Sequence, residues 1–293
     1  MIDLKSKLEY HYKQFGRERL SPDPLEIPHR FEDARDIEIA AFFAAKFAYG
    51  AVSQIIKNVN ELLTRLDDQP FRVLSQSDDL EERVTGFYYR FYSTEDVISL
   101  LYAIRYFIHK NGSLKALFLE GFNINKSLRE GIQHFSNSFL LFAQKEGRLT
   151  RGFAHFFPLP DKGSACKRMN LFLRWMVRED ELDFGLWKEI GTENLIIPLD
   201  LHIARISKEI GLTIRNDSSW KTAAEITSKL RDFDPKDPVK YDFALCHISM
   251  RKMSCSGAAK CACKAVAPME PRKSAILSRS PPTGRATPSP RTA

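Results

Sequence analysis

Residues 36–66 read DIEIAAFFAAKFAYGAVSQIIKNVNELLTRL and give a clear helical signal. The first half, 36–49, is apolar on nearly every side, which is typical of a helix buried in a protein core. The second half carries apolar residues at helical spacing from Val52 to Leu66. Gly50 separates the two halves, and we expect it to cap the first helix. The stretch therefore predicts two consecutive helices.

Helical spacing continues outward from this pair through most of the first 250 residues. Ser93 and Asp96 form a pattern like the capping box that opens a helix, which should run from Thr94 to Lys110 and end before Asn111 and Gly112. Gly211 lies where a left-handed residue would end a later helix. Further helices are expected at 127–146, 165–179, 200–210, 219–231 and 238–248. No strand-like alternation extends over several residues, so the sequence predicts an all-α fold.

The composition changes abruptly after residue 250. The segment 251–293 contains nine Lys or Arg residues and one acid, a net charge of +8 in a chain whose formal charge is +7. Residues 1–250 therefore carry about −1. The segment is rich in Pro, Ser and Arg and buries too little apolar surface to offset its ordering entropy. We predict an all-helical domain, 1–250, and a disordered basic tail, 251–293. The tail is either an arm that follows phosphates, a solvated appendage or a coding artefact.

The chain of 293 residues, with 43% hydrophobic and 28% charged residues, has the composition of an ordinary globular protein. It lacks the roughly 18 consecutive apolar residues of a membrane span, and residues 1–14 lack a signal-peptide-like apolar run. Five cysteines do not make a disulfide scaffold, which favours a reducing compartment. We expect a cytoplasmic monomer without membrane contact.

The search for chemical motifs first excludes several common sites. The chain has no Gly-rich phosphate loop, no His-Glu-x-x-His pair and no Gly-x-Ser-x-Gly elbow. Four cysteines would suffice for an iron–sulfur cluster, but their spacing lacks the usual Cys-x-x-Cys pair. We therefore predict no metal and no cofactor. The cysteines concerned are Cys246, Cys255, Cys261 and Cys263.

The segment 159–170, LPDKGSACKRMN, places a lysine at the start of a helix. A Pro/Gly turn precedes it, Ser164 is a candidate cap, and Lys167 should lie in the first helical turn. Cations favour the opposite end of the helix dipole, and the following helix is strongly apolar. A lysine whose surroundings disfavour its charge can act as an amine nucleophile. The alternative is an exposed lysine without a chemical role.

A second segment, 197–206, reads IPLDLHIARI. Asp200 is a natural N-cap for the helix that it opens. His202 fits a packed or surface position better than a catalytic one, and Arg205 fits a structural or phosphate partner better than a reacting group.

Together the two segments resemble the helix-hairpin-helix DNA glycosylases, whose signature is a hairpin with a catalytic lysine followed by a loop that ends in a catalytic aspartate. The separation of 33 residues between Lys167 and Asp200 is similar to the archaeal 8-oxoguanine glycosylase branch. Residues 38–63 resemble the helix pair that opens the glycosylase core. More closely, residues 1–248 resemble an uncharacterised family of bacterial proteins, in segments such as 163–168, 172–178 and 237–245.

The glycosylase resemblance implies a role for each matching residue. Lys167 would attack C1′ of a damaged nucleoside, such as 8-oxoguanine in duplex DNA, and form a Schiff base that permits β-elimination. Asp200 would deprotonate Lys167 or stabilise the developing oxocarbenium ion. Aromatic residues would surround the extruded base, with Phe47, Tyr49, Trp175 and Trp187 as candidates and a plain aromatic core as the alternative. The implied substrate contacts are Gly163, Ser164, Arg168, His202, Arg205, Trp175 and Tyr49.

The sequence also departs from that family. The usual hairpin is Leu-Pro-Gly-x-Gly, but Asp161 stands at the first glycine position, and Lys167 lies two positions later than in the common motif. Residues 1–250 lack the basic excess expected for strong phosphate contact. A second reading is therefore a catalytically silent helical protein that binds nucleic acid or a protein partner, and a third is a small-molecule enzyme on the same scaffold.

Overall fold

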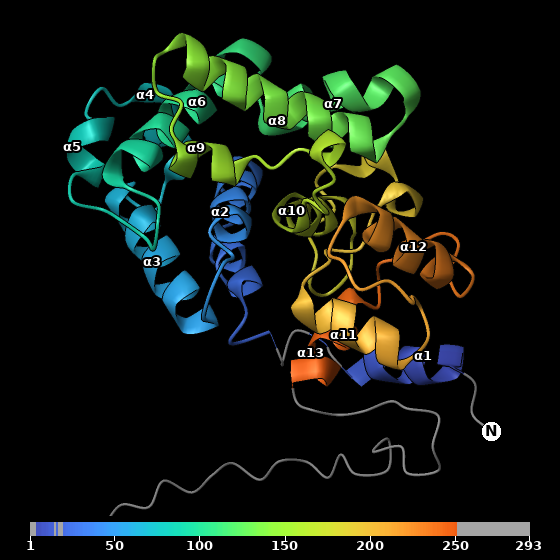
Figure 1. Cartoon of the computed structure of the whole chain (residues 1–293). Coiled ribbons are helices and arrows are strands. Elements are labelled where there is room, and N and C mark those ends of the chain that lie inside the picture. The colour runs from blue at the N-terminus through green and yellow to red at the C-terminus, as the bar shows by residue number, and fades with distance from the viewer. Residues whose placement is uncertain (1–3, 15, 17–19, 251–293) are drawn as a thin grey trace, which may run out of the picture.

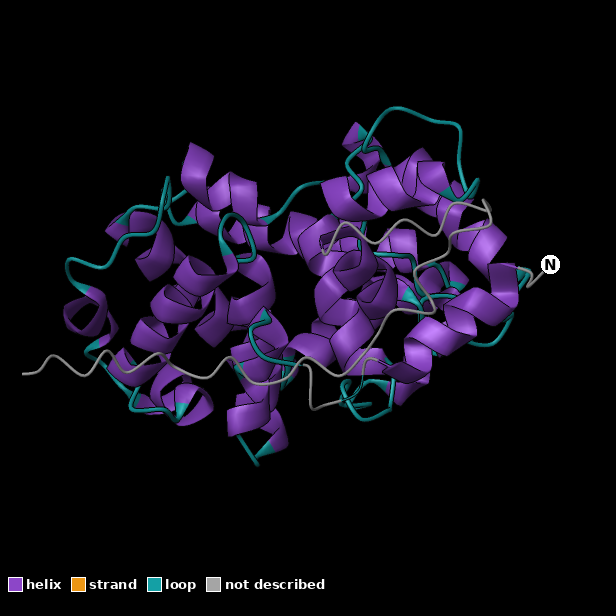
Figure 2. Ribbon diagram, turned by 90° about the horizontal axis from the view of Figure 1, so that it is seen from below, coloured by secondary structure: helices purple, strands orange, loops and turns teal. Residues whose placement is uncertain are grey.

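The computed structural model describes residues 4–14, 16 and 20–250, which form helices joined by loops and no sheet (Figures 1 and 2). This confirms the all-α class for the described residues. The predicted tail, 251–293, lies outside them. The α-helices are α1 (Leu4–Gln14), α2 (Ala34–Lys46), α3 (Val52–Arg65), α4 (Pro70–Gln76), α5 (Leu80–Val84), α6 (Thr94–Asn111), α7 (Leu114–Asn125), α8 (Leu128–Lys145), α9 (Arg151–Phe156), α10 (Lys167–Val177), α11 (Leu201–Glu209), α12 (Trp220–Arg231) and α13 (Asp242–Met250).

Helices α2 and α10 pack against each other in the middle of the molecule (Figure 1). Helices α3 to α6 and α9 lie on the α2 side, α11, α12, α13 and α1 lie on the α10 side, and α7 and α8 extend across the top of the view above both central helices. Phe42 of α2 contacts Phe172 of α10 and Phe135 of α8, with ring centroids 5.3 and 5.9 Å apart. All three rings are fully buried, so the central helices are joined through one aromatic core.

Several predicted helix signals are confirmed by the local geometry. Ser93 and Asp96 form a complete capping box at the start of α6, and Gly112 ends that helix in the left-handed region. Gly211 follows α11 with φ of +79°. Helices α3, α8, α11 and α12 occupy the predicted ranges to within two residues.

Other boundaries differ from the prediction. Helix α2 ends at Lys46 with Phe47 as its cap, so Gly50 is not the C-cap but lies in the following loop with φ of +121°. Ser164 does not cap α10. Its Oγ accepts from the N–H of Cys166, 3.1 Å away, and Cys166 itself precedes the first residue of the helix. Cys166 is the N-cap of α10, without a side-chain bond.

Helices outside the predicted ranges include the short α4, α5 and α9, together with α1 and α7. Short helices give weak periodicity because they span only one or two turns. Helix α13 begins at Asp242, four residues after the predicted start. Short 3₁₀ helices fill several loops: η2 (Pro24–Glu26), η3 (Pro28–Arg30), η4 (Pro160–Lys162), η5 (Lys188–Ile190) and η6 (Thr192–Asn194).

Candidate functional site

A cleft of about 610 Å³ opens where the two halves of the molecule meet. One wall comes from η2 and from the loop between α2 and α3, and the other from α10, the start of α11, and α13. The lining is mostly apolar with a few charged groups, which is the usual character of a small-molecule or base pocket. The charged lining residues are Asp23, Lys167, Arg168, Arg174, Asp200 and Asp242.

The turn between α9 and α10 positions the lysine at this cleft. Gly163 adopts φ of +83°, which only glycine adopts without strain, and allows the chain to reverse after η4. The carbonyl of Gly163 accepts a hydrogen bond of 3.0 Å from the N–H of Trp220, so the turn is tied to the start of α12. Lys167 is then the first residue of α10, as the sequence predicts.

Lys167 and Asp200 face each other at the cleft. The Lys167 Nζ lies 3.5 Å from Asp200 Oδ2, and the two side chains are 35% and 19% exposed. Asp200 Oδ1 accepts from the N–H of Ile203 at 2.8 Å and so caps α11. One oxygen of Asp200 therefore caps α11, and the other lies near the Lys167 amine. The amine remains accessible to a ligand.

Of the nine predicted site residues, seven line the cleft; Gly163 and Arg205 are not among its lining residues. Arg205 pairs with Glu209 at 3.8 Å. Arg168 lines the cleft but is only 7% exposed. Its guanidinium donates to the carbonyl of Lys46 at 2.8 Å and to the carbonyl of His155. Arg168 therefore binds the protein's own backbone.

The four aromatic candidates divide into two pairs. Trp175 and Tyr49 line the cleft: Trp175 is buried, and Tyr49 is 48% exposed. Phe47 and Trp187 are buried and do not line it; the Trp187 indole donates to Glu38 at 2.9 Å. Phe47 and Trp187 are therefore residues of the aromatic core, which was the alternative prediction for these candidates.

The cleft also contains carboxyl groups that the sequence analysis did not select. Asp242 Oδ2 accepts from Arg174 Nη1 at 2.5 Å, and burial raises the pKa of Asp242 to about 6 although Arg174 opposes the change. Asp23 Oδ1 accepts from the N–H of Leu25 at 2.9 Å, and burial raises the pKa of Asp23. No local motif marks either residue: Asp23 lies in a Ser-Pro-Asp-Pro turn, and Asp242 at a helix start.

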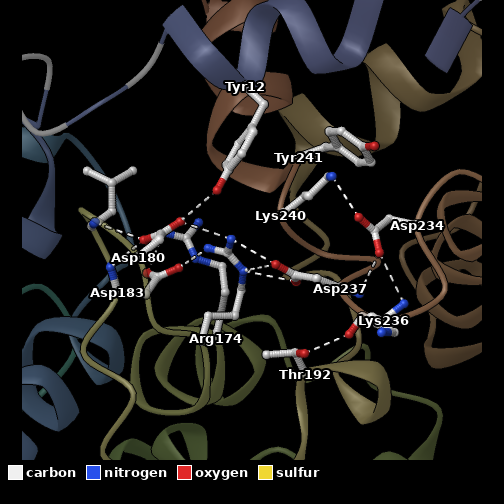
Figure 3. Close-up of polar contacts among 12 residues, drawn as sticks. Tyr12, Arg174, Asp180, Asp183, Thr192, Asp234, Lys236, Asp237, Lys240 and Tyr241 are labelled. Carbon is white, nitrogen blue, oxygen red and sulfur yellow. Dashed lines mark hydrogen bonds and ion pairs between the residues drawn. The ribbon is translucent and has the colours of Figure 1, made fainter. Parts of the chain in front are cut away.

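A buried ionic network continues from the cleft along α10 (Figure 3). Arg174 lies 3.2 Å from Asp183, and Arg178 binds Asp183, Asp180 at 2.9 Å and Asp237 at 3.0 Å. Although burial disfavours the charge of both guanidinium groups, the carboxylates raise the pKa of Arg174 and Arg178. The network anchors the second half of α10 to the loops and to α13.

Asp161, which stands at the first glycine position of the usual hairpin, forms an ion pair in the structure. Asp161 forms an ion pair of 2.8 Å with Arg129 of α8, and both side chains are about half exposed. Arg129 thereby compensates part of the negative charge with which Asp161 would repel a phosphate.

Within the described part of the chain, no group of His, Cys, Asp or Glu residues is arranged to hold a metal ion. The proposed fourth member of a cysteine cluster, Cys246, lines the cleft, while Cys255, Cys261 and Cys263 lie outside the described residues. Among the described helices, none is long and apolar enough to cross a bilayer.

Searches among curated proteins and among solved structures found no match. A family model with the description "Protein of unknown function (DUF2400)" matches residues 23–251. This range includes every element that lines the cleft, from η2 to α13, and leaves out α1 and residues 252–293. Because the model covers well over half of the chain, the protein belongs to this family.

Proposed function

We propose that the protein is a DNA glycosylase and abasic-site lyase of helix-hairpin-helix type that acts on an oxidised base such as 8-oxoguanine. The observation that carries the proposal is the pair formed by Lys167 Nζ and Asp200 Oδ2, 3.5 Å apart at a cleft. An amine that is within reach of a carboxylate and open to a ligand is the arrangement that Schiff-base chemistry needs. The partner is damaged duplex DNA, and the protein acts as a cytoplasmic monomer.

In this mechanism the carboxylate of Asp200 first takes a proton from the Lys167 ammonium. The neutral amine attacks C1′ of the nucleoside, the C1′–N bond breaks, and the base leaves with its bonding electrons and takes up a proton. Opening of the sugar ring at O4′ then gives the Schiff base between Lys167 and C1′. Removal of a C2′ proton expels the 3′ phosphate by β-elimination, and water releases the lysine.

The cleft walls suit an extruded base better than a phosphate. A base must leave the duplex before an enzyme can reach its C1′. Trp175 and Tyr49 offer aromatic surface for stacking, while the three carboxyl groups of the lining match its three Lys and Arg residues, so the cleft has no excess positive charge for a phosphate.

Borohydride trapping tests the proposal. Wild type, Lys167→Ala and Lys162→Ala are incubated with duplexes that contain an abasic site or 8-oxoguanine, and the covalent adduct is measured. Lys162 is the matched control because it is an exposed lysine on the same hairpin outside the cleft lining. An adduct that requires Lys167 and survives Lys162→Ala supports the mechanism. Folded wild type that forms no adduct contradicts it, and an adduct with Lys167→Ala refutes the site.

The second candidate is a catalytically silent protein that binds nucleic acid or a protein partner. One observation favours it: the guanidinium of Arg168, a predicted substrate contact, is bound by the backbone of the protein itself. Salt-dependent DNA binding without excision or trapping would support this reading.

A further inference from the structure

Three carboxyl groups line the cleft, and they differ in their partners. Asp200 pairs with Lys167, and Asp242 pairs with Arg174 at 2.5 Å. Asp23 forms no ion pair with any residue in the described ranges 4–14, 16 and 20–250. Among those residues, the one hydrogen bond of its carboxyl group joins Oδ1 to the N–H of Leu25. The second oxygen of Asp23, Oδ2, is therefore left without a protein donor.

Asp23 belongs to the same charged group as the reacting pair. Lys167 and Arg174 both act electrostatically on Asp23, and Asp23, Asp200 and Asp242 all act on the thiol of Cys246. Asp23 lies on the wall opposite α10, at the start of η2, where the cap bond to Leu25 fixes the direction of its carboxyl group. Oδ2 is not among the buried side-chain atoms that lack a partner, so it is open to the cleft, where a donor of a ligand can replace water.

We propose that Asp23 is the residue that selects the base: its open oxygen accepts a hydrogen bond from a ring N–H or amino group of the extruded nucleobase. This inference rests on the proposed function, which supplies the extruded base. The substrate class is then a nucleobase that presents an N–H donor at the edge facing η2. A base that presents only acceptors or methyl groups there leaves the carboxylate unpaired and is rejected, since unpaired buried polar groups give strong discrimination.

The experiment uses the full chain and separates base recognition from lysine chemistry. Asp23→Asn keeps an oxygen for the Leu25 cap and replaces the open acceptor by a donor. Glu32→Gln removes an exposed carboxylate outside the cleft and is the matched control. Each variant is assayed for excision of 8-oxoguanine under single-turnover conditions and for borohydride trapping on an abasic site, which carries no base.

We expect Asp23→Asn to lower excision about 10- to 100-fold, the range for a lost hydrogen bond to a charged group, and to keep wild-type trapping on the abasic site. Glu32→Gln should keep both activities. Unchanged excision by Asp23→Asn overturns the inference. Equal loss of excision and trapping also overturns it, because Asp23 would then act on the fold or on Lys167.

Failure of the proposed function gives a different result: wild type then neither excises 8-oxoguanine nor forms a trapped adduct on the abasic site. In that case calorimetric titration with 8-oxo-2′-deoxyguanosine and with caffeine, a purine without N–H donors, tests Asp23 directly. Binding of the nucleoside alone, lost in Asp23→Asn, supports the role of Asp23 in a binding site without chemistry. Absence of nucleoside binding, or binding that Asp23→Asn keeps, overturns it.

Discussion

Asp200 divides its two oxygens between two neighbours, so a pair of substitutions separates its roles. Asp200→Asn keeps an N-cap for α11 but loses the base for Lys167, whereas Asp200→Ala loses both. We expect both variants to lower trapping strongly, and only Asp200→Ala to lower the free energy of unfolding, by about 1 kcal/mol. Urea unfolding and trapping measure the two effects. Full trapping by Asp200→Asn would show that Asp200 is only a cap.

His155 gives a prediction of pH dependence at the same scale. Burial and the nearby Arg168 lower its pKa to about 4, below the usual value of 6.5. Between these values the unfolded chain binds more protons than the folded chain. The contribution of His155 to stability is therefore present above pH 6.5 and is lost as the pH falls toward 4.

Two measurements check this prediction for His155. The NMR signals of its imidazole should not titrate between pH 5.5 and 8. In urea unfolding, His155→Gln should lose less stability than wild type when the pH is lowered from 7 to 5. A His155 titration midpoint near 6.5 would contradict the prediction.

At the scale of elements, α10 connects the cleft with a buried ionic network. Asp183 lies between Arg174 and Arg178 with a side chain that is fully buried and pairs with both guanidinium groups, which also pair with Asp242, Asp180 and Asp237. Removing one partner of a buried ion pair costs up to about 3–5 kcal/mol. We expect this loss of unfolding free energy in Asp183→Ala.

The neighbouring pair of Lys188 and Glu179 provides the control, because both of its side chains are 65% exposed. Lys188→Ala should cost less than about 1 kcal/mol, since water screens an exposed pair. Chemical denaturation of the two variants at pH 7 makes the comparison. Equal losses would show that burial does not set the strength of these interactions.

At the scale of the whole molecule, positive charge is concentrated outside the domain. Residues 251–293 contain nine Lys or Arg residues and one acid. Each phosphate contact steepens the fall of DNA affinity with salt. A chain ending at residue 251 should therefore bind DNA more weakly and with a shallower salt dependence than the full chain, at unchanged melting temperature. Fluorescence anisotropy at several salt concentrations measures the slopes, and identical slopes would exclude a phosphate-binding role for the tail.

The sequence by itself determined the helical class and most helix positions, because apolar spacing, caps such as Ser93 and Asp200, and the glycines 112 and 211 act over a few residues. It also selected Lys167 and Asp200, through a local motif and a resemblance. Only the tertiary structure placed these residues 3.5 Å apart and added Asp23 and Asp242 to the same cleft. It alone showed that Arg168 is bound by the protein's own backbone, since such partners lie up to 122 residues away. Local patterns determine helices, whereas a site depends on contacts between residues that no short pattern relates.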